Sequence, residues 1–252
     1  MADLEGKVAL VTGSSRGIGA AIAKLFARHG AKVVVHGRVE AALRSTTDEI
    51  KEFGGQAIYF SADVTSFGEI ETMRAAVEVR FGVVDILVAN AGGSFTMPAP
   101  FEQIPEEGWH ASIEGNLTAT FLTIKSFLPS MKSRKSGNII TISSASGRRA
   151  DARSPLPYAA AKAGIQILTQ DLAAEAGPFG IRVNCIAPET ILTDRNSLRI
   201  PEALQKSLVE WHPVRRLGTP QDVAEAALFL ASESSAWITG VVLDVAGGTV
   251  MV

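Results

Sequence analysis

Short runs of Val, Ile and Leu alternate along the chain with longer stretches in which apolar residues recur every three or four positions. The short runs predict buried strands, and the longer stretches predict amphipathic helices. This alternation is typical of repeated βαβ units, which build a parallel sheet with helices on both faces. We predict seven strands, over residues 8–11, 32–36, 56–61, 86–90, 138–143, 182–187 and 241–245.

Six helices are predicted between these strands, and several end at a glycine, which accepts the left-handed conformation of a helix terminus. The sequence therefore predicts a single-domain, Rossmann-type doubly wound α/β fold over residues 1–252. One connection, residues 189–219, has weak periodicity and is long for a compact domain, so we expect it to form a lid on the substrate side. The predicted helices span residues 17–29, 39–52, 67–81, 109–132, 158–176 and 220–231.

The composition narrows the possible functions. Of the 252 residues, 46% are hydrophobic and 20% are charged, and the formal net charge is -2. A chain without an overall positive field is a poor partner for nucleic acid or for an anionic membrane surface. The N-terminal residues lack the features of a signal peptide and no apolar run has the length of a membrane helix, so we expect a cytoplasmic protein. The histidines and the single Cys185 show no ligand spacing, so no metal site is predicted.

A glycine-rich turn follows the first predicted strand and opens a helix. Glycines let the backbone approach a pyrophosphate closely, while the free N–H groups and the positive end of the helix attract the anion. A strand, a glycine-rich turn and a helix at the first βα connection together predict a dinucleotide-binding site. The residues assigned to it are Gly13, Ser15, Arg16, Gly17, Ile18 and Gly19.

The end of the second strand bears on which dinucleotide binds. An NAD site normally has an Asp or Glu there to hold the ribose hydroxyls, but this strand ends at His36, Gly37 and Arg38. Arg38 and Arg16 form a cationic pair suited to an adenosine 2′-phosphate, so NADP(H) is the preferred cofactor. Glu40, one turn later, could take the acidic role, and NAD(H) stays possible.

A second pair of residues points to acid–base chemistry. Tyr158 and Lys162 are four residues apart in a strongly helical segment, so both side chains share one face. A Lys ammonium near a phenol favours the phenolate, and we expect Lys162 to lower the pKa of Tyr158 toward neutrality. Tyr158 then becomes a proton donor or acceptor. The alternative is a half-buried helical tyrosine beside a solvated lysine.

These motifs follow a fixed order, with Asn90-Ala91-Gly92 after the fourth strand and Ser143-Ser144 after the fifth. Over nearly its whole length the chain resembles the short-chain dehydrogenase/reductase family. The resemblance implies that Ser144 bonds the substrate carbonyl oxygen, Tyr158 delivers the proton, and Lys162 also contacts the nicotinamide ribose. It implies that Asn116 anchors a water in the proton relay, with a satisfied amide inside a helix as the alternative.

The same resemblance assigns further cofactor contacts. Asn90, Ala91 and Gly92 pack near the adenosine ribose or steady the central strand, and Asp63 and Val64 lie where the adenine would be met, unless Asp63 is a turn or cap residue. Where the family usually has Pro-Gly after its sixth strand, this chain has Pro188-Glu189. We expect Pro188, Thr190 and Thr193 to contact the nicotinamide end, and Glu189 to alter either the loop geometry or the substrate preference.

Similarity is greatest to the 3-oxoacyl-[acyl-carrier-protein] reductase-like branch, whose members reduce β-ketoacyl thioesters. Lys132, Arg134 and Lys135 precede the strand of the catalytic serine and are candidates to meet an acidic carrier protein. Phe179 stands where that branch has a second basic residue, which argues against this partner. Arg148, Arg149 and Arg153 suit a substrate with a carboxylate or phosphate, unless they are simply solvated.

We therefore expect an NADPH-dependent carbonyl reductase that transfers hydride from nicotinamide to a ketone or 3-oxoacyl carbon of a small molecule. The enzymatic alternative is an NAD(P)-dependent alcohol or sugar dehydrogenase in the oxidative direction. The non-enzymatic alternative is a dinucleotide sensor on the same scaffold. The resemblance also implies a homotetramer.

Overall fold

Seven parallel strands form one sheet in the order β3-β2-β1-β4-β5-β6-β7. The structure of the chain is a computed structural model, which describes residues 4–251. All seven strands lie where the apolar runs predict them, with boundaries shifted by one or two residues at most. The strands are β1 (Val8–Val11), β2 (Lys32–Gly37), β3 (Gln56–Ser61), β4 (Ile86–Ala89), β5 (Gly137–Ile142), β6 (Ile181–Pro188) and β7 (Val242–Val245).

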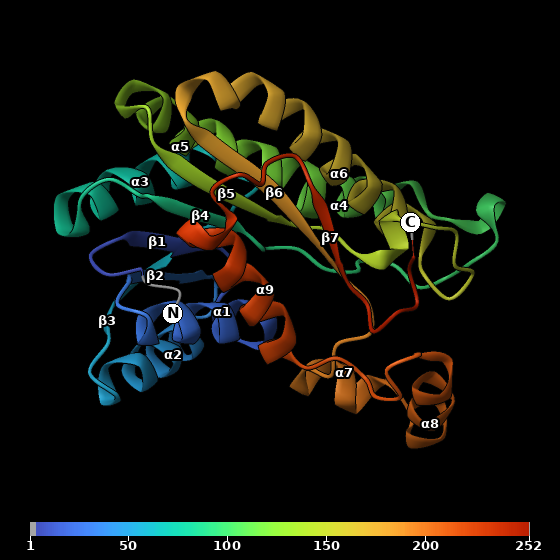
Figure 1. Ribbon diagram of the computed structural model, residues 1–252. Coiled ribbons are helices and arrows are strands. Elements are labelled where there is room, and N and C mark those ends of the chain that lie inside the picture. Colours follow the sequence, from blue (N-terminus) through green and yellow to red (C-terminus); the bar gives the residue numbers. More distant parts are fainter. Residues whose placement is uncertain (1–3, 252) are drawn as a thin grey trace.

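The central strands are buried on both faces because helices cover the sheet from both sides (Figure 1). Side chains alternate between two cores, as a pleated strand requires: Ala9 and Val11 of β1 join one core, and Val8 and Leu10 join the other. One core is closed by α1 (Gly17–Arg28), α2 (Glu40–Glu52) and α9 (Pro220–Ala231). The other is closed by α3 (Phe67–Phe81), α5 (Ala119–Arg134) and α6 (Leu156–Ala176).

The single helix predicted over residues 109–132 is interrupted. It consists of α4 (Glu106–Ile113), a π-helical turn η2 (Glu114–Thr118) and α5. A π-helical turn inserts one extra residue per turn, a change that apolar periodicity does not reveal. The turn contains Asn116, one of the predicted functional residues.

The segment 189–219, predicted to lack regular structure, contains two helices, α7 (Asp194–Arg199) and α8 (Glu202–Trp211). They project from the body of the molecule beyond the end of β6 (Figure 1). Ile191 of this segment forms an isolated parallel bridge with Gly218, which closes the excursion at its base. Within the described residues, no helix combines the length and the apolar character needed to cross a membrane.

The chain reverses its direction of travel across the sheet after β3, and β4 returns to the other side of β1. In doubly wound sheets such a reversal leaves a crevice between the carboxyl ends of the two neighbouring strands, where ligands bind. The fold therefore places its binding crevice beside the ends of β1 and β4.

Candidate active site

A cleft of about 930 Å³ opens at the carboxyl ends of the strands. The walls of the cleft contain Ser144, Tyr158 and Lys162 together with every residue that the sequence assigns to dinucleotide binding. The latter are Gly13, Ser15, Arg16, Gly17, Ile18, Gly19, Arg38, Asp63, Val64, Asn90, Ala91, Gly92, Pro188, Thr190 and Thr193.

The glycine-rich turn has the backbone conformation that its composition predicts. Gly13 and Gly17 have φ values of 65° and 58°, in the left-handed region that favours glycine. Gly19 is tightly enclosed, because a Cβ atom there would lie 2.4 Å from the carbonyl oxygen of Gly13. No side chain caps the N-terminus of α1 among the described residues, and no acidic residue lies in its first turn. An anion is the natural partner of such a helix start, so these residues fit the pyrophosphate of a dinucleotide.

His36 holds this turn in place, a role that the sequence did not suggest. The Gly13 N–H donates to His36 Nδ1 at 3.2 Å, so Nε2 carries the ring proton, and Nε2 lies 3.0 Å from the carbonyl oxygen of Ala62. Burial lowers the pKa of His36 to about 4, which keeps the ring neutral and able to accept this bond. The imidazole thus connects the turn to the end of β3.

Asn90 fastens the turn from the other side. Its side-chain Nδ2 donates to the carbonyl oxygens of Thr12 at 2.8 Å and Gly13 at 3.2 Å, and its backbone N–H donates to Thr12 Oγ1 at 3.0 Å. Asn90 also lines the cleft. The structural role considered for Asn90 is therefore present in the molecule, and its position allows a cofactor contact as well.

Three charged residues line the cleft near the glycine-rich turn and the ends of β2 and β3. Arg16 and Arg38 are exposed, and Arg38 lies 3.7 Å from Asp63. Hydrogen bonds from the Thr65 backbone and hydroxyl, with a smaller contribution from Arg38, lower the pKa of Asp63 and keep it ionised. Glu40 does not line the cleft, since it pairs with Arg44 at 2.7 Å and accepts a hydrogen bond from the Tyr59 hydroxyl at 3.1 Å.

The predicted catalytic side chains converge at the other end of the cleft. Lys162 Nζ lies 5.6 Å from the centre of the Tyr158 ring, as expected for two residues one turn apart on α6. Lys162 is 4% exposed, and its Nζ donates to the carbonyl oxygen of Ile142 at 2.8 Å. Ser144 follows β5, and its hydroxyl lies 3.5 Å from the carbonyl oxygen of Pro188. Ser144 follows β5, Pro188 ends β6, and Tyr158 and Lys162 lie on α6, so three elements meet at this group.

Burial dominates the protonation of these groups. It raises the pKa of Tyr158 above its ordinary value, with a hydrogen bond from Ser144 acting in the opposite direction and the charge of Glu189 adding to the rise. Burial also lowers the pKa of Lys162 to about 8. The prediction that Lys162 brings the pKa of Tyr158 down toward neutrality is therefore wrong for this structure, because desolvation of the phenolate is the largest influence and the Lys162 charge is not among the causes of the shift. Tyr158 is a protonated phenol at neutral pH, the form that can donate a proton.

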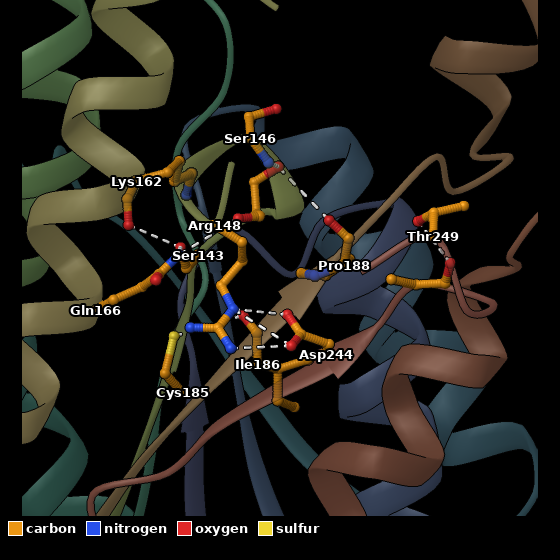
Figure 2. Close-up of polar contacts among 12 residues, drawn as sticks. Ser143, Ser146, Arg148, Lys162, Gln166, Cys185, Ile186, Pro188, Asp244 and Thr249 are labelled. Atoms are coloured by element: carbon orange, nitrogen blue, oxygen red, sulfur yellow. Dashed lines mark hydrogen bonds and ion pairs between the residues drawn. The ribbon is translucent and has the colours of Figure 1, made fainter. Parts of the chain in front are cut away.

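A buried hydrogen-bond chain connects the loop of Ser143 and Ser144 to α6 (Figure 2). Gln166 Nε2 donates to Ser143 Oγ at 2.9 Å, and the Ser143 hydroxyl donates to the carbonyl oxygen of Lys162 at 2.7 Å. Gln166 Nε2 also approaches the carbonyl oxygen of Ser144 at 3.4 Å. Both side chains are more than nine-tenths buried, so these bonds fix the serine relative to the tyrosine and lysine.

Asn116 is buried next to the cleft and does not line it. Its amide is fully used: Oδ1 accepts from the Gly93 N–H at 3.0 Å, and Nδ2 donates to the carbonyl oxygens of Gly93 at 2.9 Å and Ser112 at 2.8 Å. The side chain thus clamps the loop after β4 to the π-helical turn. The relay function suggested for Asn116 stays a prediction.

Known proteins are similar to this chain over nearly its whole length. The profile of a family described as "Enoyl-(Acyl carrier protein) reductase" matches residues 13–250. A 3-oxoacyl-[acyl-carrier-protein] reductase FabG of Vibrio cholerae is 41% identical over 251 residues, which cover 99% of this chain and 100% of that protein. The chain belongs to the short-chain dehydrogenase/reductase family. It is thus an oxidoreductase of a family that binds nicotinamide dinucleotides.

Two further relatives show the range of this family. A 7alpha-hydroxysteroid dehydrogenase of Escherichia coli K12 is 38% identical over 247 residues, covering 98% of this chain and 95% of that protein. The structure of a 7 alpha-hydroxysteroid dehydrogenase complexed with NADH and 7-oxo glycochenodeoxycholic acid superposes with a TM-score of 0.93 at 38% identity, over 98% of this chain and 95% of that one. Relatives of similar identity therefore act on very different substrates.

Proposed function

We propose that this short-chain dehydrogenase/reductase is an NADPH-dependent carbonyl reductase acting on a ketone or 3-oxoacyl carbon. The observation that carries the proposal is the convergence of Ser144, Tyr158 and Lys162 at one end of a cleft whose other end has the glycine-rich turn and two exposed arginines. A nicotinamide dinucleotide, when bound, supplies the hydride for the carbonyl carbon.

The chain's own residues would then handle the carbonyl oxygen. The Ser144 hydroxyl donates a hydrogen bond that stabilises the negative charge developing there, and the protonated phenol of Tyr158 gives its proton to the same oxygen. Hydride and proton together convert the carbonyl to an alcohol. Lys162, anchored on the carbonyl oxygen of Ile142, holds a positive charge beside the phenolate that remains.

Two features support NADPH over NADH. Arg16 and Arg38 expose guanidinium groups at the adenosine end, where a 2′-phosphate would gain charge-assisted hydrogen bonds. Glu40, the acidic residue that would suit an NAD ribose, is already bonded to Arg44 and Tyr59 and lies outside the cleft wall. The raised pKa of Tyr158 supports the reductive direction, because the phenol enters the reaction with its proton.

The test uses the two tyrosines of the chain as a matched pair. Tyr158→Phe should lower kcat for ketone reduction with NADPH by a factor of about 10²–10⁴, the usual contribution of a general acid, while the Kd for NADPH stays within about threefold. Tyr59→Phe, which removes only the exposed hydroxyl bonded to Glu40, should behave like the parent protein. Arg38→Ala should raise KM for NADPH about tenfold and leave KM for NADH nearly unchanged.

The outcomes separate the alternatives. Parental ketone reduction by Tyr158→Phe would contradict the proton assignment. Dinucleotide binding without turnover of any ketone, aldehyde or alcohol would favour a sensor. A parent protein that oxidises alcohols with NAD⁺ and shows no preference for NADPH would favour the oxidative dehydrogenase.

A further inference from the structure

The arginines near the substrate end of the cleft already have partners within the protein. Arg148 forms three hydrogen bonds with Asp244, from Nε at 2.9 Å and 3.3 Å and from Nη2 at 3.0 Å (Figure 2). Arg153 holds Asp151 in the same two-pronged way, at 2.9 Å and 2.6 Å. The Arg149 guanidinium lies 4.6 Å from the centre of the Trp211 ring and does not line the cleft. The structure therefore does not support the expectation that these arginines bind a carboxylate or phosphate group of the substrate.

Glu189, by contrast, is not held in an ion pair by any described cation, although Arg153 lies within range of its charge. It is partly buried, lines the cleft with Ser144 and Tyr158, and follows Pro188, whose carbonyl oxygen faces the Ser144 hydroxyl. Its Oε1 accepts a hydrogen bond from the Thr190 hydroxyl at 3.1 Å, and within residues 4–251 no described Lys, Arg or His nitrogen lies within 4.0 Å of it. Its field reaches both Tyr158 and Arg153.

The backbone holds this carboxylate in a defined place. The Glu189 N–H donates to the carbonyl oxygen of Val245 on β7 at 3.1 Å, and the chain then bonds to Gly218 through Thr190. Glu114 and Asp194 add further negative charge to the cleft wall, while the charges of Asp151 and Arg153 offset each other. Lys162 contributes a buried positive charge to the catalytic group, but among the described side chains that line the cleft the acidic groups outnumber the basic ones.

We propose that Glu189 is a specificity-determining residue that makes this site select carbonyl substrates with a hydrogen-bond donor, such as a hydroxyl, near the carbonyl group and disfavour those with a carboxylate or phosphate. The inference rests on the proposed reductase function and names its substrate class. A partly desolvated carboxylate gains from a donor that reaches it, and it repels a second anion brought into the same low-dielectric space.

Apolar side chains that line the same cleft suit the rest of such a substrate. Phe95 comes from the loop after β4, and Ile200, Leu204 and Leu208 come from the α7–α8 segment. A cleft with both apolar and polar lining suits a molecule that carries its carbonyl and hydroxyl groups on an uncharged hydrocarbon body.

The experiment compares matched keto alcohols and keto acids of equal chain length. The probes are levulinate and benzoylpropionate, each paired with the keto alcohol in which a CH₂OH group replaces the carboxylate. Glu189→Gln keeps the size and one acceptor oxygen and removes only the charge. Glu102→Gln, an exposed residue on η1 (Phe101–Gln103) outside the cleft wall, is the control.

The parent protein should reduce the keto alcohols with a kcat/KM about tenfold or more above that for the keto acids. Glu189→Gln should shrink this ratio at least about fivefold, mainly by improving KM for the keto acids, and added salt should shrink it in the parent but not in the variant. Glu102→Gln should keep the parental ratio. A purely structural role of Glu189 would lower all rates together and leave the ratio and its salt dependence unchanged.

The results distinguish failure of the specificity role of Glu189 from failure of the proposed reductase function. If the parent protein and Glu102→Gln reduce these ketones but Glu189→Gln keeps the parental ratio, the specificity role is overturned and the reductase function stands. A parental preference for the keto acids overturns it in the same way. If no probe is reduced with NADPH or NADH, the proposed function fails and the inference fails with it.

Discussion

Substitution of Gly19 tests how tightly the dinucleotide-binding turn is packed. A methyl group there would lie 2.4 Å from the Gly13 carbonyl oxygen, 2.6 Å from Asn90 Nδ2 and 2.8 Å from Ser14 Cα. Cβ atoms essentially never approach closer than 3.0 Å, so the turn must move by about 0.6 Å. Two of the three neighbours are backbone atoms, and the third belongs to a side chain that is itself bonded to the turn.

We expect Gly19→Ala to cost stability and to weaken dinucleotide binding. Overpacking costs about 1–3 kcal/mol, and the helix propensity of alanine returns at most about 1 kcal/mol, so the free energy of unfolding should fall by about 1 kcal/mol. The Kd for NADPH should rise at least about tenfold, because the displaced N–H groups no longer converge on the pyrophosphate. Urea unfolding gives the first value, and a fluorescence titration with NADPH gives the second.

Gly68 is the matched control. It lies in the first turn of α3, is exposed, and has nothing within 4 Å of the site of an added Cβ. Gly68→Ala should therefore raise the free energy of unfolding by up to about 1 kcal/mol and leave NADPH binding unchanged. If Gly19→Ala is as stable as the parent and binds NADPH equally well, the reasoning about the packed turn is refuted.

Two further variants test buried and capping bonds. His36→Phe removes the acceptor of the Gly13 N–H, so the Kd for NADPH should rise several-fold at unchanged kcat. Because burial lowers the pKa of His36 to about 4, the parent should lose stability as pH falls from about 6.5 toward 4, and His36→Phe should lack this loss; equal slopes would contradict the assignment. Asp222 accepts bonds from Arg216 and Thr219, which hold its pKa well below the ordinary value. Asp222→Asn should cost about 0.5–1 kcal/mol at pH 7 in urea unfolding, and this cost should shrink as the pH falls below about 4; a cost that does not change with pH would argue against an ionic cap.

The sequence predicted every strand but missed two short helices. Apolar runs located the strands because both faces of the central strands are buried. Helices α7 and α8 were missed because each is short and lies within a long connection between a strand and a helix. The π-helical turn at Asn116 depends on bonds to Gly93 that only the folded chain brings together.

The residues of the candidate site also fall into two groups, those that the sequence predicted and those that it did not. Tyr158 and Lys162 were found because their spacing along one helix is a local property. The contacts of His36 with Gly13, and of Gln166 with Ser143, join residues on different elements, so they depend on which elements become neighbours. The direction of the Tyr158 pKa shift was predicted wrongly for a related reason, since spacing alone does not report how deeply a group is desolvated.

The pair formed by Arg148 and Asp244 ties the serine loop to a residue 96 positions away on the last strand. The edge of the sheet thereby supports the loop that carries Ser144. We expect substitutions of Asp244 to disturb this loop and to appear as kinetic defects. Engineering of the final strand should therefore take the serine loop into account.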